Sequence, residues 1–141
     1  MDRRNFVRFV LAGSSVAVLA PRLTVAGIPE QGMAGRVYYT ADNPGRWSAK
    51  VKTHVPLIQI KKSEGTATVE IITPHEMKGY EHYIVKHVLF DKKFEFLGEK
   101  IFDPTKDTSP VSSFPLDGYT GTVYALSVCN LHDSWLNSAE V

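Results

Sequence analysis

From residue 51 onward, short apolar runs alternate with turn-forming residues along the chain. Runs rich in Val, Ile, Tyr and Thr that stop at Gly, Asp, Ser or Lys are typical of β-strands. Outside the N-terminus, no stretch repeats its apolar residues at the spacing of an amphipathic helix. The pattern therefore predicts strands over 35–40, 55–61, 66–73, 82–90, 94–102, 111–116 and 121–129.

About seven short strands separated by turns favour an all-β fold, an immunoglobulin-like antiparallel β-sandwich. The run at 111–116 is expected at a sheet edge, since Pro110 and Pro115 lack a backbone N–H for the ladder. A chain of 141 residues that is 43% hydrophobic and 22% charged is long enough for one domain with a buried core. Its net charge of +1 argues against nucleic acid as a partner.

The N-terminus has a different pattern from the rest of the chain. A paired arginine at 3–4 precedes an apolar run at 9–20, which is too short to span a bilayer as a helix. This order is typical of a twin-arginine export signal, and small residues at 24–26 offer a cleavage site. We therefore expect 1–26 to be a signal peptide, 27–141 to be the domain, and the mature protein to be periplasmic without a membrane span. An uncleaved N-terminal anchor is the alternative.

The single cysteine of the chain, Cys129, lies three positions before His132 at the end of the last predicted strand. Exported proteins usually pair their cysteines, so a lone thiol indicates burial, an intermolecular bridge or a metal. A thiolate and an imidazole at this spacing can bind one metal ion. The motif alone is weak, and its interpretation depends on the other four histidines.

Three of these histidines fall where strands begin or end. His54 and His82 open predicted strands, and His75 follows a strand in a loop. Side chains from such positions can meet at one end of a sandwich. A single histidine there is more often a surface residue, but three together with Cys129 and His132 favour a metal site. His87 lies within a strand at opposite parity to His82, so it is expected to face the other side of the sheet and to be no ligand.

Four motifs surround these residues: Thr53-His54-Val55-Pro56, His75 to Met77, Glu81-His82-Tyr83-Ile84, and Cys129-Asn130-Leu131-His132 with Trp135. Together they resemble the superoxide reductase family, which includes desulfoferrodoxin and neelaredoxin. The resemblance covers about 51–135 and implies an immunoglobulin-like sandwich that holds one mononuclear iron through four histidines and one cysteinate. It also implies one-electron reduction of superoxide to hydrogen peroxide, with iron re-reduced by an external electron-donor protein. The implied iron ligands are His54, His75, His82, Cys129 and His132.

The sequence departs from the family pattern next to the first histidine. Family members often carry Glu-Lys there, whereas this chain has Lys52 and Thr53. The family lysine attracts superoxide, so Lys52 is the catalytic candidate, with Lys50 and Lys78 as alternatives. On a strand, the one-residue displacement would turn Lys52 to the opposite face. The missing glutamate is expected to leave the oxidised site open to water, and Asp133 stands where the family often has a smaller residue.

Two other kinds of protein stay open at this point. A non-catalytic iron-binding protein or electron carrier of the cell envelope on the same scaffold is favoured by the altered Lys52-Thr53 pair. A plain immunoglobulin-like interaction module with scattered histidines ranks third. The single cysteine excludes the additional four-cysteine iron module that some family members carry. The identity of the electron donor and the oligomeric state, a homo-oligomer included, are left open by the sequence.

Overall fold

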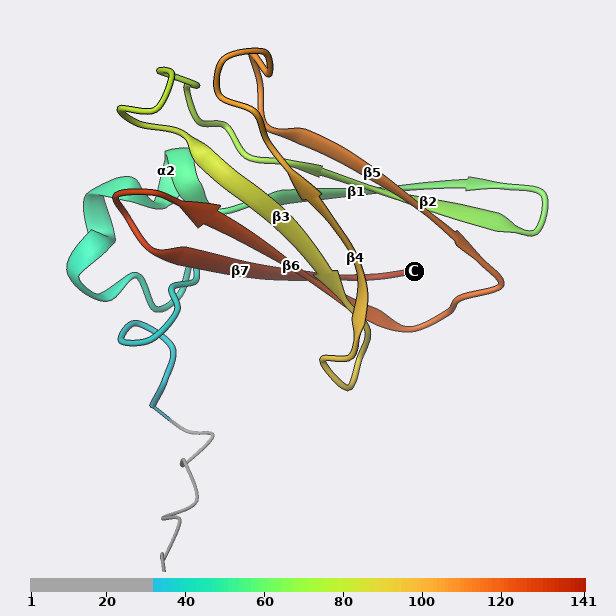
Figure 1. Cartoon of the computed structure of the whole chain (residues 1–141). Coiled ribbons are helices and arrows are strands. Elements are labelled where there is room, and N and C mark those ends of the chain that lie inside the picture. The colour runs from blue at the N-terminus through green and yellow to red at the C-terminus, as the bar shows by residue number, and fades with distance from the viewer. Residues whose placement is uncertain (1–31) are drawn as a thin grey trace, which may run out of the picture.

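The computed structural model describes residues 32–141 and shows two antiparallel sheets stacked face to face (Figure 1). The predicted signal at 1–26, its cleavage site and the first residues of the predicted domain lie outside the described part. The antiparallel β-sandwich predicted from the sequence is confirmed. The three-stranded sheet consists, in spatial order, of β1 (Leu57–Ser63), β2 (Thr66–Ile72) and β5 (Val111–Asp117), and the four-stranded sheet of β4 (Phe96–Ile101), β3 (Ile84–Phe90), β6 (Thr122–Cys129) and β7 (Ser134–Glu140).

Six of the seven predicted strands are observed, whereas one predicted strand does not form and one observed strand was not predicted. The run at 35–40 forms only isolated bridges, among them Tyr39 with Trp135. The last strand, β7, was not predicted, because its sequence contains no Val, Ile or Thr. β7 forms because β6 offers it a partner along its whole length, from Thr122 opposite Glu140 to Val128 opposite Ser134. Tertiary pairing therefore determines this strand more than its own β-propensity.

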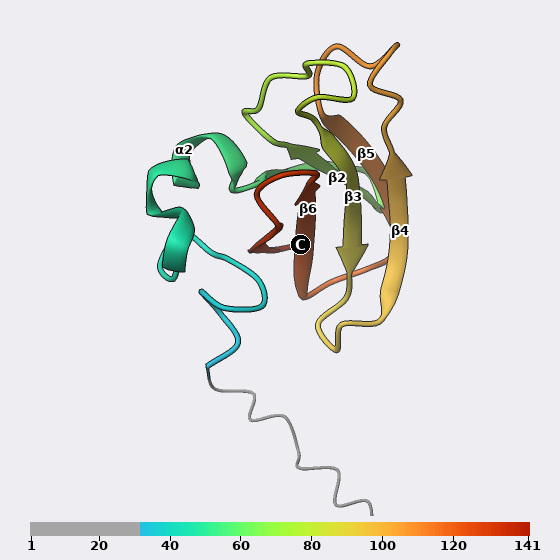
Figure 2. The ribbon, with the colours of Figure 1, turned by 60° about the vertical axis from the view of Figure 1, so that its left-hand side comes forward.

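A short helical segment precedes β1 and was also not predicted. It comprises the 3-10 helix η1 (Gly45–Lys50) and the single turn α2 (Val51–His54). His54 therefore ends a helix, and the expectation that it opens a strand was wrong. The helix ends there because Val55 precedes Pro56 and has an extended backbone, as the proline ring disfavours the helical region for the residue before it. The segment lies beside the end of the sandwich at which β6 passes into β7 (Figure 2).

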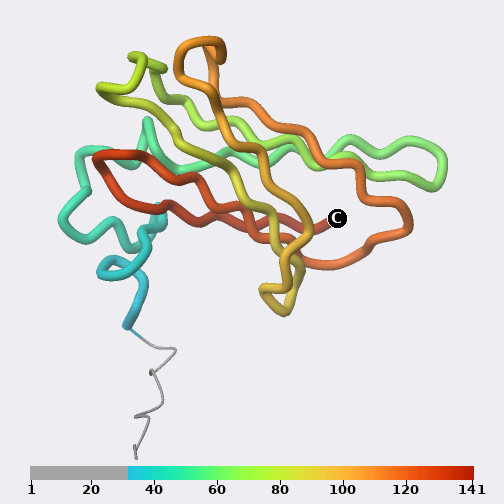
Figure 3. Tube along the Cα trace, in the orientation of Figure 1, coloured from blue at the N-terminus to red at the C-terminus, as the bar shows by residue number. Residues whose placement is uncertain are grey.

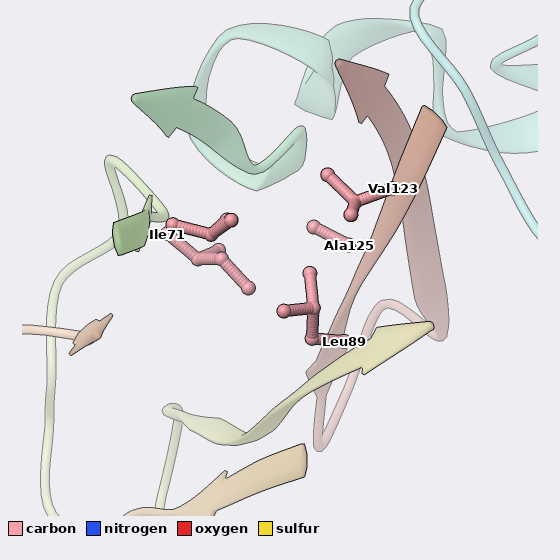
Figure 4. Packing of buried hydrophobic residues seen from close by; sticks show 5 residues of the cluster. Ile71, Leu89, Val123 and Ala125 are labelled. Atoms are coloured by element: carbon pink, nitrogen blue, oxygen red, sulfur yellow. The ribbon is translucent and has the colours of Figure 1, made fainter. Parts of the chain in front are cut away.

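The core forms where alternate residues of facing strands point between the two sheets. Val69 and Ile71 of β2 pack against Leu89 of β3 and against Val123 and Ala125 of β6, and all five are fully buried (Figure 4). The same alternation along β6 continues beyond the apolar core and places the last residue of the strand on the inner face. The core strand β6 therefore carries its cysteine into the interior.

The strand β3 is interrupted by a bulge between Ile84 and Lys86. The extra residue resets the alternation, so that Ile84, His87 and Leu89 are all buried. The parity argument made for His87 therefore does not apply, since His82 precedes the strand and the bulge follows it. His87 lies in the interior of the sandwich and is not part of the group of donor atoms that the other histidines and Cys129 form. Within 32–141, no helix is long and apolar enough to cross a membrane.

Candidate metal centre

Three separate segments bring the predicted ligands to one end of the sandwich, where the helical segment, the connection after β2 and the loop after β6 lie together (Figures 1 and 3). Each segment contributes residues at or near the end of a helix or strand. The five residues are His54 at the end of α2, His75 and His82 in the connection between β2 and β3, Cys129 at the end of β6, and His132 in the loop before β7.

The nitrogen atoms of the four imidazoles converge on one point. The Nδ1 atom of His132 lies 3.1 Å from Nε2 of His54 and 3.1 Å from Nε2 of His82. The Nε2 atom of His82 lies 2.9 Å from Nε2 of His75. The ring centroids of His54 and His75 are 4.6 Å apart, which closes the ring of four. Ligand atoms of His54, His75, His82 and Cys129 all lie within 4.8 Å of one another.

The sulfur of Cys129 lies close to three of these nitrogens. Its distance is 3.4 Å to His82 Nε2, 3.7 Å to His132 Nδ1 and 3.9 Å to His75 Nε2. A metal ion with bonds of about 2.1 Å to nitrogen holds neighbouring ligands at right angles about 3.0 Å apart. The nitrogen separations of 2.9–3.1 Å match that value, so the five donors fit one metal ion with the histidines as neighbours and the sulfur on one side.

The outward ring nitrogens are held by backbone oxygens. His54 Nδ1 lies 3.1 Å from the carbonyl oxygen of Lys50 and 2.8 Å from the hydroxyl of Thr53. His75 Nδ1 contacts the carbonyl oxygen of Glu76. When Nδ1–H donates to a carbonyl oxygen, the tautomer is fixed and Nε2 keeps a lone pair that can bind a metal ion. The second ring nitrogen of these histidines therefore orients the first toward the centre.

Burial keeps the imidazoles neutral. Desolvation, with smaller contributions from the neighbouring His75 and His132, lowers the pKa of His54 from 6.5 to about 4. Desolvation is also the first cause that lowers the pKa of His75, His82 and His132. Neutral imidazoles are the form that binds metal. The four nitrogens are therefore available as ligands at neutral pH.

The thiol lies in an apolar environment. Cys129 is buried and packs with Ile84, Phe102 and Met77. Burial raises the pKa of this thiol, while the backbone N–H groups of Leu131 and His132 act in the opposite direction. A metal ion bound to sulfur deprotonates a thiol outright. Metal binding at this centre is therefore expected to release the Cys129 proton.

The helical geometry changes the argument about the lysines. Lys50 lies four residues before His54, the spacing that places two residues on one face of a helical turn. Its charge contributes to lowering the pKa of His82 and His132, after the larger effect of burial. Lys52 is exposed, and it is not among the charges that contribute most to the pKa shifts of His54, His82 and His132. The strand-parity argument made for Lys52 was wrong because the segment is helical, and its catalytic role stays a prediction.

A tryptophan and an aspartate that sequence reasoning did not place cover His132. The carboxylate of Asp133 accepts hydrogen bonds from Trp47 Nε1 at 2.8 Å and from Arg46 Nη2 at 2.5 Å. The Trp47 ring meets the His132 ring edge to face, with centroids 4.7 Å apart. Trp135 Nε1 donates to the carbonyl oxygen of His132 at 2.9 Å. Asp133 therefore anchors η1 against the metal centre. In the sequence, the only sign of this contact was that Asp133 stands where the family often has a smaller residue.

Comparisons with known proteins show what the chain is similar to. A family profile described as desulfoferrodoxin matches residues 46–138. The chain is similar to superoxide reductase (neelaredoxin) from Ignicoccus hospitalis, with 28% identity, a TM-score of 0.62, and 76% of this chain and 95% of that chain covered. It is also similar to the Archaeoglobus fulgidus protein of the same name in its reduced form, with 25% identity, a TM-score of 0.58 and coverage of 74% and 98%. The superoxide reductase from Nanoarchaeum equitans, at 20% identity, a TM-score of 0.56 and coverage of 64% and 94%, shares the fold. No curated protein sequence matches the chain.

Proposed function

Because the chain belongs to the desulfoferrodoxin family, we propose that it is a superoxide reductase, which reduces superoxide to hydrogen peroxide with an electron from an external donor protein. The family and the donor set agree on a mononuclear iron centre. The observation that carries the proposal is the convergence of four imidazole nitrogens and one thiol at a single point. In the balanced reaction, superoxide takes up one electron and two protons and gives hydrogen peroxide.

The donor set suits this chemistry. Iron cycling between Fe²⁺ and Fe³⁺ supplies the single electron. The residues that hold it would be His54, His75, His82, Cys129 and His132. Imidazoles suit iron, and a thiolate donates electron density to it.

Charge and access favour a small anion as substrate. Four neutral imidazoles and one thiolate leave a divalent cation with a net positive charge. Lys50 and Lys78 add positive charge beside His82. Cys129, His54 and His75 are buried, whereas His82 and His132 are half-buried, so solvent reaches the centre from the side of these two histidines. An anion approaching from solvent would therefore meet positive charge before it meets the buried sulfur.

The test is iron content, visible spectrum and reaction rate of the same preparation. We expect one iron per chain, a sulfur-to-iron charge-transfer band after mild oxidation, and a rate with superoxide near the diffusion limit of about 10⁸–10⁹ M⁻¹s⁻¹. Cys129→Ser is the matched control, which should retain iron but lose the band. A mutant with the wild-type spectrum would show that Cys129 is not a ligand.

A non-catalytic iron carrier is the second candidate function. It is favoured by the absence of the Glu-Lys pair before His54, where the chain has Lys52 and Thr53. The two functions separate on rate, since a carrier would bind iron and show the band but react slowly with superoxide. A slow reaction in a fully iron-loaded protein would favour the carrier.

The proposed place of action is the periplasm, reached through the twin-arginine pathway. The proposal is supported by the arginine pair at 3–4 and the apolar run at 9–20. The intact mass of the protein recovered from a periplasmic fraction tests it, since removal of 1–26 would leave a chain that begins at Gly27. Recovery of the uncut chain in the membrane fraction would support the anchor instead.

A further inference from the structure

A buried polar cluster lies between the two sheets, next to the metal centre. It consists of His87, Thr73, Ser112 and Ser127, whose residues are at most 5% exposed. Thr73 Oγ1 lies 2.8 Å from His87 Nε2 and 2.7 Å from Ser127 Oγ, and His87 Nδ1 lies 2.7 Å from Ser112 Oγ. In the part of the chain that the structure describes, no buried side-chain nitrogen or oxygen lacks a partner.

All three hydrogen bonds of the cluster cross the gap between the sheets. Ser112 belongs to β5, and Thr73 follows β2 directly and donates its backbone N–H to Pro110, so both lie on the side of the three-stranded sheet. His87 of β3 and Ser127 of β6 are paired neighbours in the four-stranded sheet. Hydrogen bonds hold their partners at a defined distance and direction, unlike apolar contacts. The cluster therefore fixes the separation of the sheets at this end of the sandwich.

The protonation state of the cluster is suited to this role. Burial lowers the pKa of His87 to about 4, so its ring is neutral, with one nitrogen that donates and one that accepts. A hydroxyl can donate one hydrogen bond and accept another. The three hydrogen bonds from Ser112 through His87 and Thr73 to Ser127 can therefore all form at once, with each group donating to the next along the chain. A neutral His87 ring is sufficient for this arrangement.

Two members of the cluster are connected to predicted iron ligands, one that follows β2 and one at the end of β6. The carbonyl oxygen of Thr73 accepts the backbone N–H of His75 at 2.7 Å. Ser127 is two residues before Cys129 on the inner face of β6, so both side chains point the same way. The distance of 3.9 Å between Cys129 Sγ and His75 Nε2 spans the same gap that the cluster bridges.

We propose that His87, through Thr73 and Ser127, is a positioning residue that sets the distance and direction of His75 relative to Cys129 across the sandwich. This inference rests on the iron centre proposed above but not on its activity toward superoxide. The geometry of the sulfur relative to the four histidines would influence both the sulfur-to-iron charge-transfer band and the midpoint potential. The band and the potential are therefore expected to shift when the hydrogen bonds of Thr73 to His87 and Ser127 are removed.

The experiment compares variants of the full chain loaded with iron. Thr73→Val removes the hydroxyl that bonds His87 and Ser127 while keeping the size of the side chain. It is expected to shift the band and the potential and to weaken iron binding about tenfold. Ser112→Ala is the matched control, because it removes one hydrogen bond of the same cluster on the side away from the ligands. It should lower stability and leave the band and the potential unchanged.

Two conservative replacements of His87 divide its two hydrogen bonds. The amide of glutamine reaches the place of Nε2 and keeps the bond to Thr73, whereas the amide of asparagine reaches the place of Nδ1 and keeps the bond to Ser112. His87→Gln should therefore keep the wild-type band and potential, and His87→Asn should shift both. A general loss of packing would not produce this difference in band and potential between the two variants.

The outcomes are distinct. Should Thr73→Val not fold, Ser127→Ala tests the same link and is expected to shift the band. A wild-type band and potential in folded, iron-loaded Thr73→Val or Ser127→Ala would overturn the proposal, as would equal shifts in Ser112→Ala. Absence of activity toward superoxide in every protein, with the pattern of bands intact, would overturn the proposed function and leave the positioning role standing.

Discussion

Acid is the perturbation that most directly tests the interior of this protein. His87 is fully buried, and desolvation is the sole cause that lowers its pKa from 6.5 to about 4. In the unfolded chain the same ring is hydrated and protonates near pH 6.5. As the pH falls, the unfolded state therefore takes up a proton that the folded state refuses. The contribution of His87 to stability is fully present above about pH 6.5 and is lost as the pH falls toward 4.

The magnitude follows from the two pKa values of His87. Their difference corresponds to about 3 kcal/mol in the limit, of which about 2 kcal/mol is lost between pH 7 and pH 5. Domains of this size are stable by only about 5–15 kcal/mol. A loss of about 2 kcal/mol from one side chain is therefore a measurable fraction of the total.

The assay is urea unfolding of the metal-free full chain at pH 7 and at pH 5, followed by circular dichroism. Burial also lowers the pKa of His54, His75, His82 and His132 in the folded chain, so these residues add to the pH dependence and the wild type alone does not isolate His87. His87→Gln retains these four and lacks the buried ring. We expect its stability to fall by about 2 kcal/mol less than that of the wild type between the two pH values. Equal losses in both proteins would refute the argument that His87 is buried in its neutral form.

Three further predictions concern the lysines, the core and the cover of His132. Measured by pulse radiolysis, Lys50→Ala should lower the rate with superoxide about tenfold and weaken the dependence of this rate on ionic strength, while Lys52→Ala should do neither. A larger effect of Lys52→Ala than of Lys50→Ala would show that Lys52 is the lysine that attracts superoxide. Leu89→Ala should lower the free energy of unfolding of the metal-free protein by about 2–5 kcal/mol in urea, because Leu89 is fully buried between the sheets. Asp133→Ala removes the acceptor of the Trp47 indole and should shift tryptophan fluorescence to the red, whereas Asp133→Asn keeps an acceptor and should not.

The strands that sequence reasoning predicted are those with local signals. In β2 and β6, fully buried residues alternate with less buried ones, and this period of two is visible in the chain itself. β7 lacks that composition and depends on its pairing with β6. The bulge in β3 between Ile84 and Lys86 has no local signal either, and it moved His87 to the interior. Alternation counted along the sequence therefore gives the wrong face after a bulge, and it misses a strand that forms only because a neighbouring strand pairs with it.

The candidate site was predictable as a set of residue types but not as an arrangement. Cys129 and the four site histidines carry a recognisable motif, and the structure brings them together. The position of Lys50 depended on a helical turn of four residues, which is too short to produce periodicity in the sequence. Trp47 and Asp133 are 86 positions apart, so their hydrogen bond follows from the fold alone. Contacts of this range require the three-dimensional structure.

The segments that bear the ligands are anchored by protein contacts that do not pass through the metal. The segment of His54 is fixed where Val55 packs with Tyr39 and Trp135, which attaches α2 to β7. The segment of Cys129 is fixed by the ladder of β6 and by its apolar neighbours, and that of His75 by its hydrogen bond to Thr73. These contacts position the donor residues independently of their bonds to the metal. A donor set held by the protein in this way suits a centre that must keep its geometry while its iron changes charge.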